Sequence, residues 1–232
     1  MTKHFHEAGE HGHYDARYFA GEVERARAGT ILLELLRAFG NAVRPLGVTP
    51  ILMHGALIGW AWSRRLLPWD RDIDLCALVG ELAVQGRYED LAPALPRWLG
   101  ELSPLDAERR IDDLRADSLD MLVALAVLDR RAGGLDYDRT RFLLDVNPGY
   151  LDPATRNRHP RETVEENKID ARFIDRATGL YLDVTALRPA PAADDGAPRV
   201  ATKCPHVYRV ADLLPLDAAE IDVEVAVAAG AA

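Results

Sequence analysis

The chain has 232 residues, of which 48% are hydrophobic, and a formal net charge of −9 at pH 7. This length and composition suffice for one substantial domain with its own core, whereas the acidic balance argues against nucleic acid as a partner, because binding its backbone needs a basic face. Two cysteines are too few for a disulfide framework or a four-cysteine zinc site, and no stretch approaches the roughly 20 apolar residues of a membrane span.

The first residues, 1–17, are rich in histidine, glutamate and glycine. Histidine-rich tracts can bind metal, but a flexible polar segment is the favoured interpretation for a chain terminus of this composition. The next segment, Tyr18–Phe39, carries apolar residues at helical spacing on one face, which predicts an amphipathic helix. These apolar residues are Ile31, Leu32, Leu35, Leu36 and Phe39.

A phosphate-binding turn is predicted at Gly55. The short apolar run Ile51–Met53 reads as a strand, Gly55 follows it, and Ala56–Ser63 has helix-forming composition. A strand, a glycine turn and a helix N-terminus leave free backbone N–H groups where a phosphate can bind.

Two aspartates separated by one residue open the predicted strand Asp72–Leu78. Residues i and i+2 of a strand point to the same face, so Asp72 and Asp74 present their carboxylates side by side. Such a pair suits Mg²⁺, which usually completes its shell with substrate phosphates. The alternative is a polar strand face in water, and the glycine turn upstream favours the phosphoryl-transfer site. Asp70 shares this parity and is either a further ligand or a cap at the start of the strand.

Helices over Tyr88–Leu99 and Asp117–Arg131 are predicted next, followed by a buried strand over Phe142–Val146. Arg188–Pro198 is rich in proline and alanine and reads as a loop. Val210–Leu216 reads as a short final element.

A β-hairpin is predicted over Ala171–Leu187. The segment 175–179 supplies its turn, and Gly179 suits a positive φ. In the second strand Leu182 and Val184 alternate with polar neighbours, so Asp183 lies on the polar face. Taken alone, Asp183 is either an exposed strand residue or a third acid of a site.

The order of these motifs resembles the LicD/fukutin family, whose signature reads approximately HG[ST]LLG…R…PWD.D[IV]D. The chain has HGALIGWAWSRRLLPWDRDIDL at His54–Leu75, and three later segments resemble further family motifs. These are FLLDVNP at Phe142–Pro148, NKIDARFIDRATGLYLDVTAL at Asn167–Leu187 and CPHVYRVADLLPL at Cys204–Leu216. The N-terminal FHEAGEHGHYDARYF resembles the fungal branch of the family.

The resemblance implies a single α/β (α+β) domain over residues 18–216, with the mixed β-sheet and flanking helices of the nucleotidyltransferase superfamily that includes DNA polymerase β. It also implies metal-dependent transfer of a phospho-group, of the phosphocholine, sugar-phosphate or polyol-phosphate type. The donor would be a CDP-, GDP- or UDP-linked nucleotide, the acceptor a glycan hydroxyl, and the cofactor Mg²⁺ or Mn²⁺. By analogy the fungal-like motifs point to cell-wall or glycoprotein mannan. The compartment stays open, since relatives often work in the secretory pathway.

Residue roles follow from the same resemblance. Asp72, Asp74 and Asp183 fill the positions of the catalytic, metal-binding acids. The residues implied to bind substrate are His54, Gly55, Ala56, Arg64, Trp69 and Arg172. For Trp69 a buried aromatic hinge is an equal alternative, and for Arg64 a surface position.

Two departures from the family pattern support a second interpretation. Ala56 stands where the family has serine or threonine, which removes a hydroxyl that could bind phosphate. The tail, 217–232, is acidic and then alanine-rich, where the family continues with a helical portion, and is expected to be disordered. The alternative is a catalytically impaired family member that binds a nucleotide-sugar or a partner without turnover.

Overall fold

The computed structural model describes residues 3–43, 50–78, 135–148, 169–190, 196–197, 199–201, 206–209 and 212. The predicted helices Tyr88–Leu99 and Asp117–Arg131 and the tail 217–232 lie outside these residues, as does all of Val210–Leu216 except Asp212. No helix in the described part of the chain is both long and apolar enough to cross a membrane.

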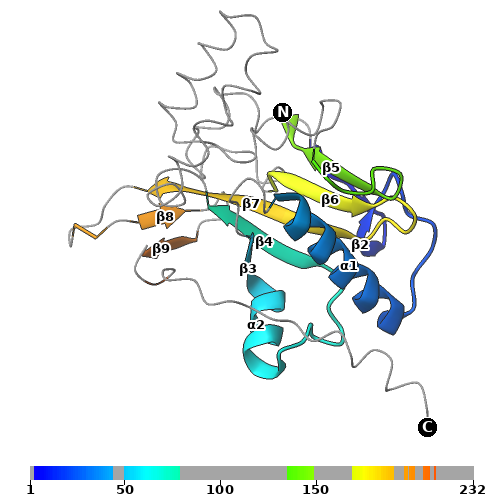
Figure 1. Ribbon diagram of the computed structural model, residues 1–232, viewed down its shortest axis with the longest axis horizontal. Coiled ribbons are helices and arrows are strands. Elements are labelled where there is room, and N and C mark those ends of the chain that lie inside the picture. The colour runs from blue at the N-terminus through cyan, green and yellow to red at the C-terminus, as the bar shows by residue number, and fades with distance from the viewer. Residues whose placement is uncertain are drawn as a thin grey trace, which may run out of the picture.

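A mixed β-sheet forms the centre of a single α/β domain, in agreement with the predicted fold class (Figure 1). Its main strands run in the order β3-β4-β7-β6-β5. Strand β8 pairs with β7 outside this order, and β9 pairs with β8. Strands β4 and β7 are parallel and the other neighbours are antiparallel. The strands are β3 Pro50–Leu52, β4 Ile73–Leu78, β5 Phe142–Val146, β6 Ala171–Asp175, β7 Tyr181–Ala190, β8 Arg199–Ala201 and β9 Val207–Arg209.

Two predicted β elements are confirmed. Strand β5 spans the predicted residues, and β6 and β7 form the predicted hairpin, with Gly179 at φ 85° in its turn. Strand β7 runs on to Ala190, into the segment 188–198 that was predicted as a loop, because its last residues pair with β8.

Helix α1 spans Arg25–Val43, so it begins seven residues later than the start predicted at Tyr18. The Glu24 carboxylate accepts hydrogen bonds from the backbone N–H groups of Ala26 and Arg27 at 3.0 and 3.2 Å, which caps the helix there. The helix lies against β6 and β7 (Figure 1). Its apolar face reaches the sheet through Phe39, whose ring centroid is 5.5 Å from that of Phe173.

The N-terminal segment, expected to be flexible over 1–17, forms a β-hairpin of β1 (Glu7–Ala8) and β2 (His11–Asp15). Tyr14 is fully buried, and its hydroxyl oxygen accepts a hydrogen bond from the Val23 N–H. The Asp15 N–H donates to the Gly179 carbonyl at 2.8 Å, which ties this N-terminal hairpin to the β6–β7 turn. A buried tyrosine and a backbone bond to the sheet therefore order a segment whose composition is polar.

Candidate functional site

The sheet brings the three predicted acids together. Asp74 on β4 and Asp183 on β7 are paired in register, and neighbouring strands lie about 4.8 Å apart. Asp72 directly precedes β4 and has the same parity as Asp74. We call Asp72, Asp74 and Asp183 the acid cluster. Asp183 is only 7% exposed, which excludes the alternative of a solvent-exposed strand aspartate.

Crowding of negative charge changes the protonation of the site. Burial, followed by the charges of Asp72, Asp183 and Asp70, raises the pKa of Asp74 to about 7. Burial and then the charge of Asp72 raise the pKa of Asp70 to about 6. Burial also raises the pKa of Asp183 to about 6, against the opposing effect of the Arg172 charge. A bound cation would stabilise the ionised form of each carboxylate.

Asp72 has a cationic partner that the sequence did not reveal. His13, on β2 of the N-terminal hairpin, places its Nδ1 3.0 Å from Asp72 Oδ2. Burial acts to raise the pKa of Asp72, but the His13 hydrogen bond and charge lower it overall. The His13 pKa is raised by the same bond. His13 has a φ of 67°, an uncommon conformation for a residue other than glycine, which the contacts of the hairpin sustain.

Arg172, predicted to bind substrate, faces Asp183 instead of solvent. The two residues are paired across β6 and β7, and Arg172 Nε donates to Asp183 Oδ1 at 2.7 Å. Its Nη2 lies 3.4 Å from Asp183 Oδ2, so the guanidinium contacts both carboxylate oxygens. Arg172 is 3% exposed.

Helix α2 (His54–Ser63) begins beside the acid cluster, because the Met53 N–H donates to the Asp74 carbonyl at 3.0 Å. Met53 supplies no side-chain cap, so the first N–H groups of the helix have no partner from that residue. Gly55 lies against Asp70: a Cβ added to Gly55 would be 2.4 Å from Asp70 Oδ2. Ala56 is 1% exposed and belongs to the core.

Three other predicted residues lie at the surface around α2. Arg64 follows the helix in a left-handed conformation and stacks on Trp60, 4.2 Å from the ring centroid, in keeping with the surface alternative. Trp69 is 68% exposed, which excludes the buried hinge and leaves its ring free to stack on a ligand. The His54 ring centroid is 5.8 Å from that of His206, which directly precedes β9. His206 lies in one of the segments that resemble family motifs, and its spacing from Cys204 is too sparse a signal for zinc and favours a packing or pocket-lining role.

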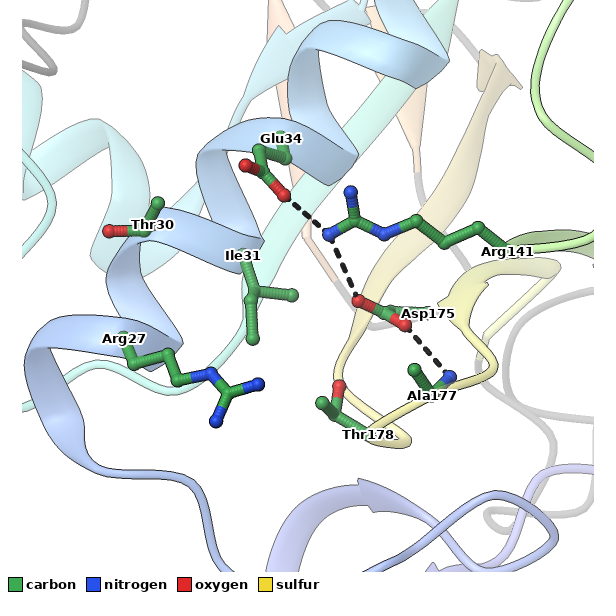
Figure 2. Close-up of a pocket in the computed structure, with 8 residues that line it drawn as sticks. All are labelled: Arg27, Thr30, Ile31, Glu34, Arg141, Asp175, Ala177 and Thr178. Atoms are coloured by element: carbon green, nitrogen blue, oxygen red, sulfur yellow. Dashed lines mark hydrogen bonds and ion pairs between the residues drawn. The ribbon is translucent and has the colours of Figure 1, made fainter.

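A cavity of about 360 Å³ opens on the other side of the sheet, between α1 and the β6–β7 turn (Figure 2). Arg141 bridges Glu34 and Asp175 across it, and the Arg27 guanidinium points into it. Asp175 has the strand parity of Phe173, which packs against α1, whereas Arg172 has the opposite parity. The cavity is therefore separate from the acid cluster.

The acid cluster suits a divalent cation in the kind of donor that it offers, since carboxylate oxygens are the preferred ligands of Mg²⁺. The positions of its side chains do not by themselves form a metal site: within the described residues, no three histidine, cysteine, aspartate or glutamate side chains are grouped so that they could hold a metal ion. Two of the three carboxylates are engaged by the protein's own cationic groups, Asp72 by His13 and Asp183 by Arg172.

Comparisons with known proteins give one family profile and two yeast relatives. Residues 47–94 match the profile described as LicD/FKTN/FKRP, nucleotidyltransferase domain. Mannosyltransferase regulator 4 of Saccharomyces cerevisiae is 26% identical over 206 residues, which cover 84% of this chain and 14% of that protein. Mannosyltransferase regulator 14 of the same yeast is 28% identical over 156 residues, 67% of this chain and 12% of that protein. The chain thus spans a small part of either relative. No solved structure gives a significant match.

Proposed function

We propose that this chain, whose matches assign it to the LicD/fukutin-related family, transfers a phospho-group from a nucleotide-diphospho donor to a glycan hydroxyl. The comparisons support a function in glycosylation, and the finer proposal rests on one observation. Strands β4 and β7 pair Asp74 with Asp183 beside Asp72, in a site where burial and then the neighbouring negative charges raise the pKa of Asp74 to about 7. Such a concentration of negative charge suits a divalent cation and the phosphates that it binds.

Mg²⁺ or Mn²⁺ is the proposed cofactor, with the acid cluster as its site. When bound, the cation neutralises charge on the transferring phosphoryl oxygens. A carboxylate of the cluster that the cation does not fully occupy accepts the proton of the attacking glycan hydroxyl, while the bond between the two phosphates of the donor breaks and a nucleoside monophosphate leaves.

The donor is proposed to lie between the start of α2 and the acid cluster. The uncapped N–H groups at this helix start suit a phosphate. Gly55, which has no side chain, permits a close approach. The exposed ring of Trp69, just before Asp70, is placed to stack on the base or the sugar of a CDP-, GDP- or UDP-linked donor.

Replacing Gly55 by valine is expected to weaken donor binding by about tenfold or more, because blocking the approach removes at least one phosphate contact. The added Cβ would lie 2.4 Å from Asp70 Oδ2, so the Asp70 carboxylate must move into the donor site. The measurement is donor affinity by calorimetry. Gly29→Ala is the matched control, since a Cβ there meets nothing within 4 Å. An unchanged affinity in folded Gly55→Val would contradict the phosphate-binding role.

A thermal-shift screen of CDP-, GDP- and UDP-linked donors, with and without Mn²⁺, tests the function directly. A donor held at 100 times its dissociation constant is expected to stabilise the protein by about 2.7 kcal/mol. We expect this shift for one class of base and only with Mn²⁺ present, followed by transfer to an oligosaccharide. If no donor raises the melting temperature under either condition, the proposed function is wrong.

The second candidate is a family member that binds the donor or a partner without turnover. Both yeast relatives are named as regulators of mannosyltransferases, and two carboxylates of the acid cluster are already engaged by His13 and Arg172. A donor-dependent thermal shift with no transfer product would favour this candidate.

A further inference from the structure

Asp183 and Arg172 form an enclosed ion pair at the proposed site. Their side chains are 9% and 4% exposed, and both oxygens of the carboxylate face the guanidinium, at 2.7 and 3.4 Å. An arginine side chain stays protonated in proteins. A divalent cation that bound Asp183 would have to displace this guanidinium and leave a permanent buried charge without its closest carboxylate partner.

Other groups fix Arg172 in place. Its guanidinium lies 3.6 Å from the Tyr181 ring centroid and 5.0 Å from that of Phe5, an arrangement that favours a cation between two aromatic rings. Asp15 and Glu7 of the N-terminal hairpin add carboxylate oxygens at 3.8 and 4.0 Å. Side chains of β7 and side chains of the N-terminal hairpin therefore both hold the arginine in place.

The other two carboxylates are held far less firmly. Asp72 meets the His13 ring, whose side chain is 48% exposed and can turn into solvent. Among the described residues no ion pair engages the Asp74 carboxylate, and burial followed by neighbouring negative charges raises its pKa. Both can accept a cation without leaving a buried charge unpaired.

We infer that Arg172 is the resident counter-ion of the third acid, so that Asp183 is a positioning residue and the divalent cation is left to Asp72 and Asp74. The part of this inference that concerns the cation rests on the proposed function. The part that concerns the ion pair does not. Asp183 holds Arg172, and Arg172 holds the N-terminal hairpin that carries His13 to Asp72. A site with two carboxylates and donor phosphates is a usual arrangement for Mg²⁺.

The first test is a Mn²⁺ titration of the full chain, followed by electron paramagnetic resonance of the free ion. Asp74→Asn is expected to weaken Mn²⁺ binding by about 100-fold and Asp183→Asn by about tenfold or less, because loss of a ligand exceeds loss of a supporting contact. Arg172→Gln is expected to tighten binding, since it frees a third carboxylate. Equal losses in Asp183→Asn and Asp74→Asn would overturn the inference.

The second test needs no metal. Unfolding by urea is compared for Asp183→Asn, Arg172→Gln and the double variant. Each single change should lower the unfolding midpoint, and the double variant should lose clearly less than the two losses added, as expected for a coupled pair. Additive losses would overturn the role of the pair. If wild-type protein binds no Mn²⁺, the proposed function fails, and this cycle alone decides whether Asp183 positions Arg172.

If Asp183→Asn does not fold, a further variant tests the same inference. Arg172→Lys keeps the charge but loses the two-point contact with the carboxylate. It should bind Mn²⁺ at least as tightly as wild type. A loss as large as that of Asp74→Asn would overturn the inference.

Discussion

Asp74→Asn is expected to lower phospho-group transfer by about 10³-fold or more, equivalent to about 4 kcal/mol of transition-state stabilisation. Asp74 is two residues from Asp72 and is paired with Asp183 across the strands, and it is the member of the acid cluster with the most strongly raised pKa. Removing its charge takes a ligand from the proposed cation site. The same change relieves repulsion among the carboxylates, so the metal-free variant should melt at or above the wild-type temperature.

The pH dependence of stability gives this prediction a second measurement. The folded-state pKa of Asp74 is about 7, against an ordinary value of 3.8. The folded state therefore binds more protons than the unfolded state between these values, and metal-free wild-type protein should lose stability as the pH rises from about 4 to about 7. Asp74→Asn removes the largest of these titrations, whereas Asp70 and Asp183, whose pKa values are raised to about 6, still titrate in this range, so the decline should become shallower but not disappear.

Melting temperatures without metal, taken at several pH values, and turnover with Mn²⁺ are measured on the same preparations. The matched control is Asp136→Asn, which changes an equal charge at an exposed position outside the acid cluster. A variant that melts well below wild type yet retains turnover would make Asp74 a structural residue, and the proposed function would lose its central group.

Local patterns in the sequence were sufficient for the strands that carry the site. Strand β5 follows from a largely apolar segment that ends at Asn147-Pro148-Gly149, and the β6–β7 hairpin follows from alternation on either side of Gly179. The two-residue spacing of Asp72 and Asp74 predicts a shared face, and the sheet preserves it. These features depend on neighbours in the chain, which a sequence displays directly.

The partners of the acids depend on contacts between distant segments. His13 and Asp72 are 59 residues apart, and only the folding of the N-terminal hairpin onto the sheet joins them. The Arg172–Asp183 pair had a detectable signal. A turn between Asp175 and Leu180 sets the register of β6 against β7, and counting outward from it places Arg172 opposite Asp183. Deriving which residues are paired across the hairpin, in addition to the alternation along each strand, would have predicted this ion pair.

Phe173→Ala is expected to lower the free energy of unfolding by about 3–5 kcal/mol, as is typical for truncating a fully buried phenylalanine. Phe173 is 1% exposed, and its ring centroid lies 5.5 Å from Phe39 on α1, 5.4 Å from Phe142 on β5 and 5.1 Å from Tyr137. One ring thus joins the helix to two strands. Its removal leaves a cavity that none of these elements can fill without moving.

Urea unfolding measures this loss, and a lower midpoint with an unchanged slope would show that stability alone has changed. Val207→Ala, at a side chain that is 52% exposed, is the control and should stay within about 0.5 kcal/mol of wild type. The alternation of side chains along β6 leads to a further expected result. Phe173 faces α1 while its neighbour Arg172 faces Asp183, so folded Phe173→Ala, studied well below its melting temperature, should keep the Mn²⁺ affinity of wild type. A parallel loss of Mn²⁺ binding would mean that the packing of α1 sets the geometry of the acid cluster, and that the two faces of the sheet do not act independently.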